Sequence, residues 1–553
     1  MTATASPARV ATHRRGSSRD LAGTAVLLRL ALRRDRIMLP AWVLVLGLAV
    51  SSVASSIKNM YGTAAERADL ARDMLANGST RALYGPVFSD SVGGLTAWRM
   101  GAFAPALAAV MSLLLVVRHT REEEETGRQE VLSSGTVGRR AGLTSALTIA
   151  LAANAGVALL VMAGLAGAGE GGTGAVALGL AIGLTGLAFA GLAAVAAQLT
   201  DNARLAKGLT AAVLGVAFVL RMAGDAAKNA AEGSSHWLVW ASPLGWAENV
   251  RPYAGERWWP LALVAVLAAA GVTAAYALAG RRDLGGGYLP DRPGPAGAGP
   301  LLHGPYGLAW RLQRGALLGW AAGLVFAGAV FGGISKDAED IIGDSGRTRD
   351  IFERMGGHQG VTDSFLAAMV DMLGLVCLVY AVSAVLRLRG EETGNRAEPL
   401  LAGPVGRLRW AGGHLLAAYL GSALVLALGG LATGVSYGLA TDDLAGQVPR
   451  LVAAGLAQVP AVWVVTSAAV FLVGALPRLS GAAWGLVGAA LAIGWLGPAV
   501  DLPQWAMDLS PFSHLPDLPG GEVSAVPFAW LAAVIAVAAG AGLAGLRRRD
   551  FGA

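Results

Sequence analysis

Long apolar stretches separated by short polar segments run through nearly the whole chain. A transmembrane helix needs roughly 20 consecutive apolar residues, and stretches of about that length recur twelve times. The pattern therefore predicts an all-α polytopic membrane protein. The predicted spans are Ile37–Ser56, Trp98–Val117, Leu143–Ala168, Val176–Leu199, Leu205–Ala223 and Trp259–Ala279, followed by Gly315–Ile334, Phe365–Leu386, Ala411–Leu439, Val448–Leu476, Gly481–Val500 and Val526–Leu546.

The second half of the sequence repeats the first. Single residues recur at one constant spacing, and short motifs recur near the end of each half. Such self-similarity predicts two homologous six-helix halves, about twelve transmembrane helices in all, related by pseudo-twofold symmetry. The repeated features are Arg33, Arg36, Trp42 and Lys58 with Arg311, Arg314, Trp320 and Lys336; Ser242-Pro243 with Ser510-Pro511; and Arg282-Asp283-Leu284-Gly285 with Arg549-Asp550-Phe551-Gly552.

Segments outside the spans set the predicted domain boundaries. Residues 1–36 form a basic N-terminal tail and a connecting helix, whose leucines and arginines fit the membrane interface. Residues 37–280 form the first six-helix half. Residues 281–314 form a cytoplasmic linker, rich in glycine and proline, and a second connecting helix at Tyr306–Arg314. Residues 315–553 form the second half.

A charged segment follows the second predicted span of each half. Both copies read Glu-Glu-Thr-Gly and then Arg-x-Glu-x-Leu-x-x-Gly-x-Val-Gly-Arg, with Asn395 as one extra residue in the second copy. A short helix with ionic anchors can transmit a push to the spans beside it, so the pair predicts two contacts with a soluble partner. The candidate contact residues are Glu124, Glu125, Gly127, Arg128, Glu130 and Arg139, with Glu391, Glu392, Gly394, Arg396, Glu398 and Arg407.

Composition and charge agree with a membrane protein. Hydrophobic residues make up 54% of the chain and charged residues 14%, with a mean hydropathy of +0.54. Most lysines and arginines fall in alternate loops, which places both termini and both charged segments in the cytoplasm. The net charge of +6 is then a topology signature, and no nucleic-acid partner is needed. We expect no removable signal peptide.

Motifs for catalysis are missing from the sequence. It has no phosphate-binding loop, no His-Glu-x-x-His and no Cys-x-x-Cys, and its seven histidines lack ligand spacing. The single cysteine, Cys377, can form no disulfide within the chain. We therefore predict a transport subunit that is not an enzyme, without catalytic residues, metal or cofactor of its own. Its energy must come from elsewhere.

The repeated charged segment resembles the first intracellular loop of type-two ABC exporter permeases. In that family, a short coupling helix after the second span docks on an ATPase subunit, and an amphipathic helix precedes the first span. The fused halves are similar to actinobacterial permeases for polyketide antibiotics, including the tetronasin type, and for multidrug export. The resemblance implies a multi-pass protein of the cell membrane that expels a bulky amphipathic compound. It also implies two copies of a separately encoded ATPase, or two different ATPases, carrying ATP and Mg.

Three alternatives stand beside this interpretation. The charged segments can be solvated helix ends that stabilise only each other. The chain can be a secondary transporter driven by an ion gradient, since that class also commonly has two six-span halves. It can also be a membrane-embedded enzyme or scaffold, although no reactive cluster supports this.

Some polar residues within or near the predicted spans need a role. Asp371 is the acidic residue deepest in a predicted span, and it is either part of the transport path or a packing group bonded to a donor. Arg221 lies near the end of a span, where we expect its side chain to reach toward water. Gln458 is expected to form a hydrogen bond between helices. Ala64–Leu83 and Lys336–Arg354 predict short helices at the outer surface.

Overall fold

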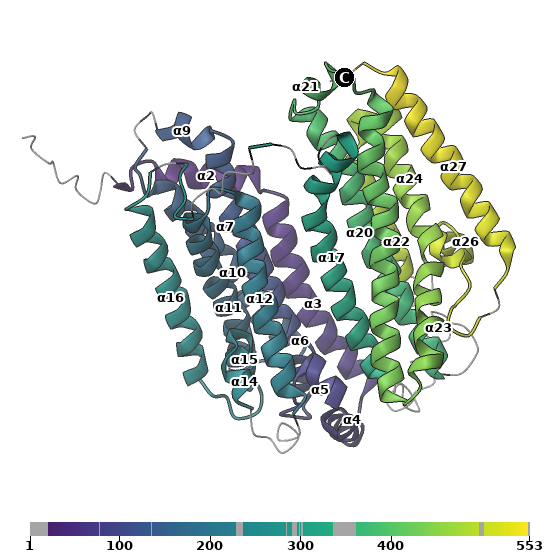
Figure 1. The fold of residues 1–553 in the computed structure, drawn as a ribbon. Coiled ribbons are helices and arrows are strands. Elements are labelled where there is room, and N and C mark those ends of the chain that lie inside the picture. The colour runs from purple at the N-terminus through teal and green to yellow at the C-terminus, as the bar shows by residue number, and fades with distance from the viewer. Residues whose placement is uncertain are drawn as a thin grey trace, which may run out of the picture. The chain divides into compact units, whose positions relative to one another are not determined.

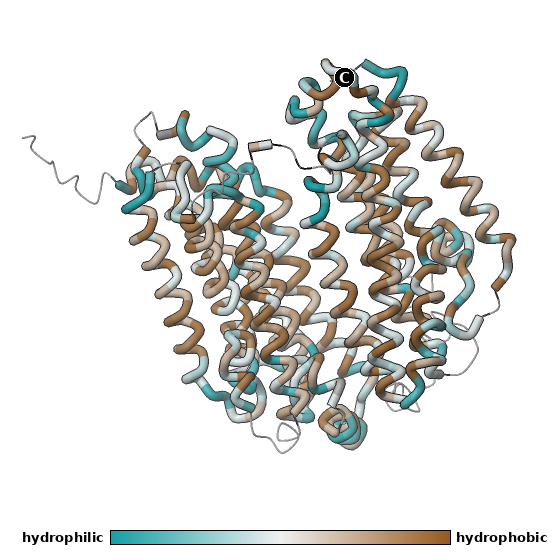
Figure 2. Tube along the Cα trace, in the orientation of Figure 1, coloured by the Kyte–Doolittle hydropathy of each residue, from teal (hydrophilic) through white to brown (hydrophobic). Residues whose placement is uncertain are grey.

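The described part of the chain is entirely helical in its regular elements. The computed structural model describes residues 20–550 apart from 77, 134, 136, 228–235, 284, 290–295, 298, 300, 301, 303, 336–360, 497–502 and 522. It divides into two compact units, Met1–Arg292 (unit 1) and Pro293–Ala553 (unit 2). Eleven helices among the described residues are long and apolar enough to cross a membrane. In each unit, hydrophobic residues fill the helices and hydrophilic ones gather at their ends (Figure 2).

Unit 1 is built around α11, which packs against α7, α10 and α16. Small residues permit this packing, since a Cβ on Gly271 of α16 would lie 2.8 Å from the backbone of Gly191 in α11. The short helices lie at the two ends of the unit (Figure 1). The helices are α2 (Thr24–Arg34), α3 (Met38–Met60), α4 (Ala64–Ala76), α5 (Gly78–Tyr84), α6 (Val92–Met100), α7 (Phe103–Arg118), α8 (Arg121–Glu125), α9 (Arg128–Ser133), α10 (Ala141–Gly167), α11 (Thr173–Leu199), α12 (Ala203–Asp225), α14 (Trp237–Trp240), α15 (Pro243–Glu248) and α16 (Trp259–Ala279).

Unit 2 is built around α20, which packs against α17, α22 and α24. Its last helix, α27, lies so close to α24 that a Cβ on Gly474 would be 2.0 Å from the carbonyl oxygen of Gly542. The helices are α17 (Pro305–Ser335), α20 (Val361–Thr393), α21 (Glu398–Leu401), α22 (Arg407–Ala440), α23 (Leu444–Ala457), α24 (Val459–Ala475), α25 (Ala482–Leu491), α26 (Gln504–Met507) and α27 (Ala525–Arg548), with 3₁₀ turns η2 (Pro477–Leu479) and η4 (Pro511–His514) and a π-helical turn η3 (Ala492–Leu496).

Two predicted spans are interrupted in the structure. The predicted span Trp98–Val117 is present but begins later than predicted, because α6 ends at Met100 and α7 begins at Phe103. Pro105 has no N–H to continue a helix from Gly101, which explains the break. The span continues instead to Glu125. The predicted span Val448–Leu476 is divided into α23 and α24 at Gln458, just before Pro460.

The connecting helices differ between the units. In unit 1, α2 and α3 are separate helices, as expected, whereas in unit 2 the predicted connecting helix and first span form one continuous helix, α17. The predicted surface helices of Ala64–Leu83 are present as α4 and α5. The corresponding prediction for Lys336–Arg354 and the last residues of the predicted span Gly481–Val500 lie outside the described residues.

Candidate functional site

The charged segment of unit 1 is bound to the residues that follow the last helix of that unit. Arg282 lies just after α16, and its Nη1 donates to Oε2 of Glu124 at 2.8 Å. Arg121 Nη1 donates to the same carboxylate oxygen at 2.8 Å. Both arginines are largely buried, with exposed side-chain fractions of 10% and 0%. Charge-assisted hydrogen bonds of this kind are about twice as strong as neutral ones.

Arg121 and Arg139 extend this contact along the backbone. Arg121 Nε donates to the carbonyl of Ala197 at the end of α11 (3.0 Å), and its Nη2 donates to the carbonyl of Gly286 (2.8 Å). Arg139, the last residue of the charged segment, donates to the carbonyl oxygen of Arg282. The loop after α7 is therefore tied both to α11 and to the residues after α16.

Unit 2 has the same kind of contact at its own repeated motif. Arg549, after α27, donates from both terminal nitrogens to the two carboxylate oxygens of Glu392, at 2.5 and 2.7 Å. Arg389 also pairs with Glu392 at 3.0 Å. Arg407, the last residue of the charged segment, donates to the carbonyl oxygen of Arg549 at 2.5 Å. We call the two arrangements the clamps: Glu124 with Arg282 and Arg139 in unit 1, and Glu392 with Arg549 and Arg407 in unit 2.

Several candidate acids therefore interact with their own chain. The carboxylate of Glu125 accepts from the backbone N–H of Ala203, and Glu391 pairs with Arg396 at 2.9 Å. Glu391 and Glu392 are buried. Some of the acids that were predicted to contact a soluble partner therefore pair with arginines of their own unit.

Exposed candidate residues lie on or beside the two short helices α9 and α21, and Arg139 at the end of the first segment is exposed as well. Arg128 and Glu130 are exposed in unit 1, and Arg396 and Glu398 are exposed in unit 2. The chain turns through a left-handed residue before each helix: Gly127 (φ 70°) in unit 1 and the extra residue Asn395 (φ 55°) in unit 2. Gly394, which aligns with Gly127 in the repeat, is not left-handed, so the turn of unit 2 falls one residue later.

The two charged segments also differ in their neighbours. Glu122 pairs with Lys207, and Glu123 pairs with Arg34 of α2. Unit 2 has Arg389 at the position of Glu122, and that arginine joins the clamp. Helix α21 begins at Glu398, with a proline in its first turn, and has four residues against six in α9. The two short helices are therefore unequal.

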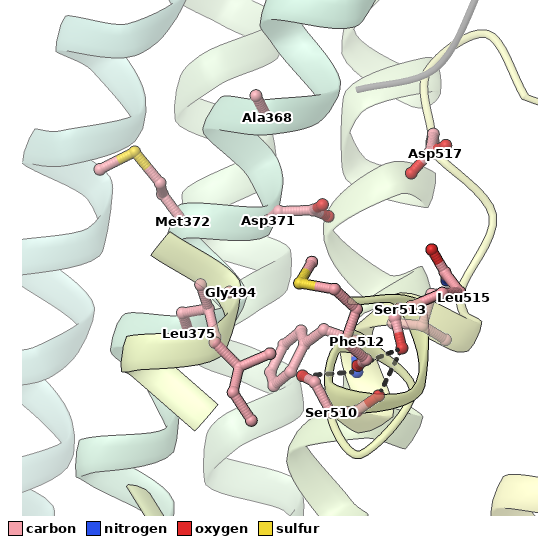
Figure 3. Close-up of a pocket in the computed structure, with 13 residues that line it drawn as sticks. Ala368, Asp371, Met372, Leu375, Gly494, Ser510, Phe512, Ser513, Leu515 and Asp517 are labelled. Atoms are coloured by element: carbon pink, nitrogen blue, oxygen red, sulfur yellow. Dashed lines mark hydrogen bonds between the residues drawn. The ribbon is translucent and has the colours of Figure 1, made fainter. Parts of the chain in front are cut away.

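Asp371 borders a cavity of about 220 Å³ within unit 2. Figure 3 shows the carboxylates of Asp371, from α20, and Asp517, after η4, directed toward the same space. Gln458, which is fully buried, donates its Nε2 to Asp371 Oδ1 at 2.5 Å, so the expected bond between helices is present. The other lining residues are Ala368, Met372, Leu375, Ile493, Gly494, Gln504, Met507, Ser510, Phe512, Ser513 and Leu515.

Comparison with known proteins identifies the family. The family model of the multidrug efflux system permease Rv1217c, C-terminal domain, matches residues 26–280 and 302–547. The chain is also 44% identical, over 547 residues, to the multidrug efflux system permease protein Rv1217c of Mycobacterium tuberculosis, and the match covers 98% of each chain. The chain belongs to this family of efflux permeases. The resemblance to multidrug export permeases is thereby confirmed.

The burial of Arg221 in this efflux permease contradicts the prediction that its side chain reaches toward water. Its side chain is fully buried, and Nη1 pairs with Asp225 at 3.1 Å and with Glu248 at 3.0 Å. Its Nη2 donates to the carbonyl oxygens of Ala82 and Leu83. A buried guanidinium needs such partners, and the i,i+4 spacing of Arg221 and Asp225 was a sequence signal for the first of them.

The clamp arginines were also absent from the predicted site. The repeat of Arg282-Asp283-Leu284-Gly285 as Arg549-Asp550-Phe551-Gly552 was visible in the sequence, but nothing linked it to the charged segments. The contacts join residues about 160 positions apart, so only the packed helices of the efflux permease bring them together.

Proposed function

We propose that this chain is the transmembrane permease of an ATP-driven ABC exporter. In this proposal the chain has twelve spans in two pseudo-symmetric halves, with both termini and both charged segments in the cytoplasm of a cell-membrane protein. Two ATPase subunits, identical or different, bind ATP and Mg. The chain itself hydrolyses nothing and holds no cofactor. The exported compound is bulky and amphipathic, which agrees with the multidrug efflux named for the Mycobacterium tuberculosis relative.

The recurrence of the clamp in both units is the observation that carries this proposal. In each unit, an acid of the charged segment pairs with the arginine that follows the last helix, and the arginine at the end of the segment bonds to that arginine's backbone. The clamp holds the loop to the helix ends, and α9 or α21 carries the exposed charges beside it. A displacement of either short helix by a soluble partner would then move the spans.

Co-purification with an ATPase tests the proposal. The chain is expressed with its genomic neighbours and isolated in detergent, as wild type and as the double variant Glu130→Lys plus Glu398→Lys, which reverses an exposed charge beside each clamp. The matched control is Asp69→Lys, an exposed acid on α4. We expect an ATPase to co-purify with wild type and control and to be lost from the double variant. Equal recovery of the ATPase with all three proteins would contradict the docking surface.

The cavity at Asp371 favours one second candidate, a transporter driven by an ion gradient. A carboxylate inside a span is costly unless it is paired or neutralised, and such groups mark ion paths in many transporters. Solute uptake into vesicles that contain the chain alone, driven only by a proton or sodium gradient, would support this function. Absence of uptake without ATP and the ATPase would exclude it.

A further inference from the structure

One pair of arginines recurs in both units and takes no part in the clamps. Arg33 and Arg36 of unit 1 recur as Arg311 and Arg314 of unit 2. All four side chains are exposed, and none of the described residues forms an ion pair or a hydrogen bond with them. A guanidinium group keeps its positive charge and offers five N–H donors. Each unit therefore presents two cationic groups that can bind an anion from outside the chain.

A buried polar residue lies between the two arginines in each unit. In unit 1 it is Asp35, which accepts from Nε2 of His119 at 2.6 Å and pairs with Arg118 at 3.1 Å. In unit 2 it is Gln313, whose Nε2 donates to Nδ1 of His414 at 3.1 Å. These bonds tie the segment to the end of α7 in unit 1 and to α22 in unit 2. Because the middle residue is held inside, the fold directs the arginines on either side of it outward.

An exposed apolar stripe begins directly after each pair of arginines. In unit 2, Leu318 lies four residues after Arg314, so the two side chains share one face of α17, and Val325 continues that face. Leu318 is 67% exposed. In unit 1, the stripe begins at Ile37, which is 75% exposed, and continues along α3 with Leu44. Each pair of arginines is therefore followed by apolar side chains on the outer face of a span.

The surroundings of the arginines fit the depth of lipid head groups. Helix α2 lies across the ends of the long helices of unit 1, at the end that also carries α9 (Figure 1). In unit 2, the exposed aromatic residues Tyr306 and Trp310 lie in the first turns of α17, and such side chains are enriched where a membrane meets water. Helices α3 and α17 are long enough to cross a membrane. The arginines thus lie where a span begins, and the stripes run along the span.

We propose that each unit binds an anionic phospholipid through its pair of arginines. The phosphate of the head group accepts hydrogen bonds from Arg33 and Arg36 in unit 1 and from Arg311 and Arg314 in unit 2, since the guanidinium fork matches phosphate geometry. An acyl chain of the lipid lies along the apolar stripe of α3 or α17. Clusters of arginine beside a membrane span are typical of sites for anionic lipids. The inference goes beyond the function proposed above and does not depend on an ATPase.

The charges and the stripe together favour an anionic lipid over other occupants. A zwitterionic lipid brings a cationic group close to the two guanidinium groups, which repel it, whereas phosphatidylglycerol has no such group. A soluble protein or a free phosphate ion would leave uncovered the apolar stripe of a helix that crosses the membrane. An acyl chain covers that stripe while the phosphate binds the arginines.

Lipid binding to the isolated chain tests this inference. Dioleoyl phosphatidylglycerol and dioleoyl phosphatidylcholine are added separately to the detergent-solubilised chain, and native mass spectrometry counts the bound lipids. We expect two molecules of phosphatidylglycerol, one for each unit, to bind roughly tenfold more tightly than phosphatidylcholine. Equal binding of the two lipids would overturn the proposal, and this comparison requires no variant to fold.

Substitutions then locate the two sites. Arg33→Gln plus Arg36→Gln is expected to lose one of the two tightly bound phosphatidylglycerol molecules. Arg311→Gln plus Arg314→Gln is expected to lose the other. The melting temperature of each double variant checks that it is folded. Two tightly bound molecules in both folded double variants would overturn the proposal.

The matched control removes the same charge elsewhere. It is Arg204→Gln plus Arg478→Gln, in which one arginine lies in the first turn of α12 and the other in η2. Both side chains are exposed. We expect this variant to keep both phosphatidylglycerol molecules. A loss equal to that of the two double variants would show that net charge, and not the paired arginines, attracts the lipid.

Two further measurements separate the lipid from other occupants. Glycerol phosphate, which lacks acyl chains, is expected to displace no phosphatidylglycerol at the same concentration, and displacement would overturn the assignment to a lipid. The ATPase that co-purifies is expected to be recovered with both double variants, and its loss while lipid binding is unchanged would assign the arginines to the protein partner. A chain that binds phosphatidylglycerol through these arginines but recovers no ATPase would contradict the exporter and keep the lipid sites.

Discussion

The two units keep the same clamp but differ in how they satisfy a pair of carboxylates. In unit 1, Asp225 and Glu248 share the buried guanidinium of Arg221. In unit 2, Asp371 and Asp517 border a cavity whose described lining contains no basic residue. The repeated motifs are therefore alike in both units at the clamps, where the charged segment is bound to the residues after the last helix. The units differ at the sites where acidic groups lie among apolar ones: Arg221 pairs with both acids in unit 1, whereas the two acids of unit 2 border a cavity.

The largest expected effect comes from removing the internal cation of unit 1. Arg221→Met leaves Asp225 and Glu248 buried without their partner, and breaking a buried ion pair in this way costs about 3–5 kcal/mol. We expect a large fall in melting temperature in detergent. The control is Arg72→Met, which breaks an exposed pair with Asp69 and should change stability by about 0–1 kcal/mol. Equal shifts for the two variants would show that Arg221 is not a structural cation.

The clamps allow a test of what the units share. Arg282→Gln and Arg549→Gln each remove a charge-assisted contact, which is worth roughly 1.5–3 kcal/mol for a hydrogen bond to a charged group. We expect each to reduce the activity of the associated ATPase severalfold while the ATPase still co-purifies, because the exposed helices remain. Arg281→Gln, next to the first clamp, is the control. If both variants match the control in ATPase activity, the clamps do not carry the coupling.

The smallest effects are expected at the turns before α9 and α21. Gly127→Ala places a Cβ on a left-handed residue and should cost about 1 kcal/mol, whereas Asn395→Gly should be nearly neutral, since asparagine already tolerates that conformation. Melting temperatures of the two variants measure the difference. A larger loss for Asn395→Gly than for Gly127→Ala would show that the Asn395 side chain has a role beyond its backbone.

The sequence predicted most of the helices because length and apolar content alone identify a span. It failed where the limit is set by one residue, as at Pro105, which separates α6 from α7. It also could not predict the pairing register of the clamps. The sequence repeat aligns Glu124 with Glu391, yet the clamps use Glu124 and Glu392. Helix α20 continues unbroken into the first residues of the second segment and ends at Thr393, whereas the helix before the first segment is interrupted between α7 and α8. A shift of one residue turns a helix by about 100°.

The candidate site was predictable only in part. Asp371 was evident as an acid within a span, and its bond to Gln458 joins two residues that the sequence had singled out. Asp517 and the cavity were not evident, because they depend on how the turn after Ser510 folds against α20. The burial of Arg221 was not predicted, because its position near the end of a predicted span does not show which residues pack around it. Its partner Glu248 comes from another helix, α15.

Transport in a reconstituted system tests the central claim most directly. The chain and its co-purified ATPase are placed in vesicles, and uptake of a fluorescent amphipathic amine is followed with ATP and Mg. The controls are vesicles without nucleotide and vesicles with the chain alone under a proton or sodium gradient. The account predicts uptake only when ATP and the ATPase are both present. Uptake by the chain alone under an ion gradient, at the same rate, would contradict it.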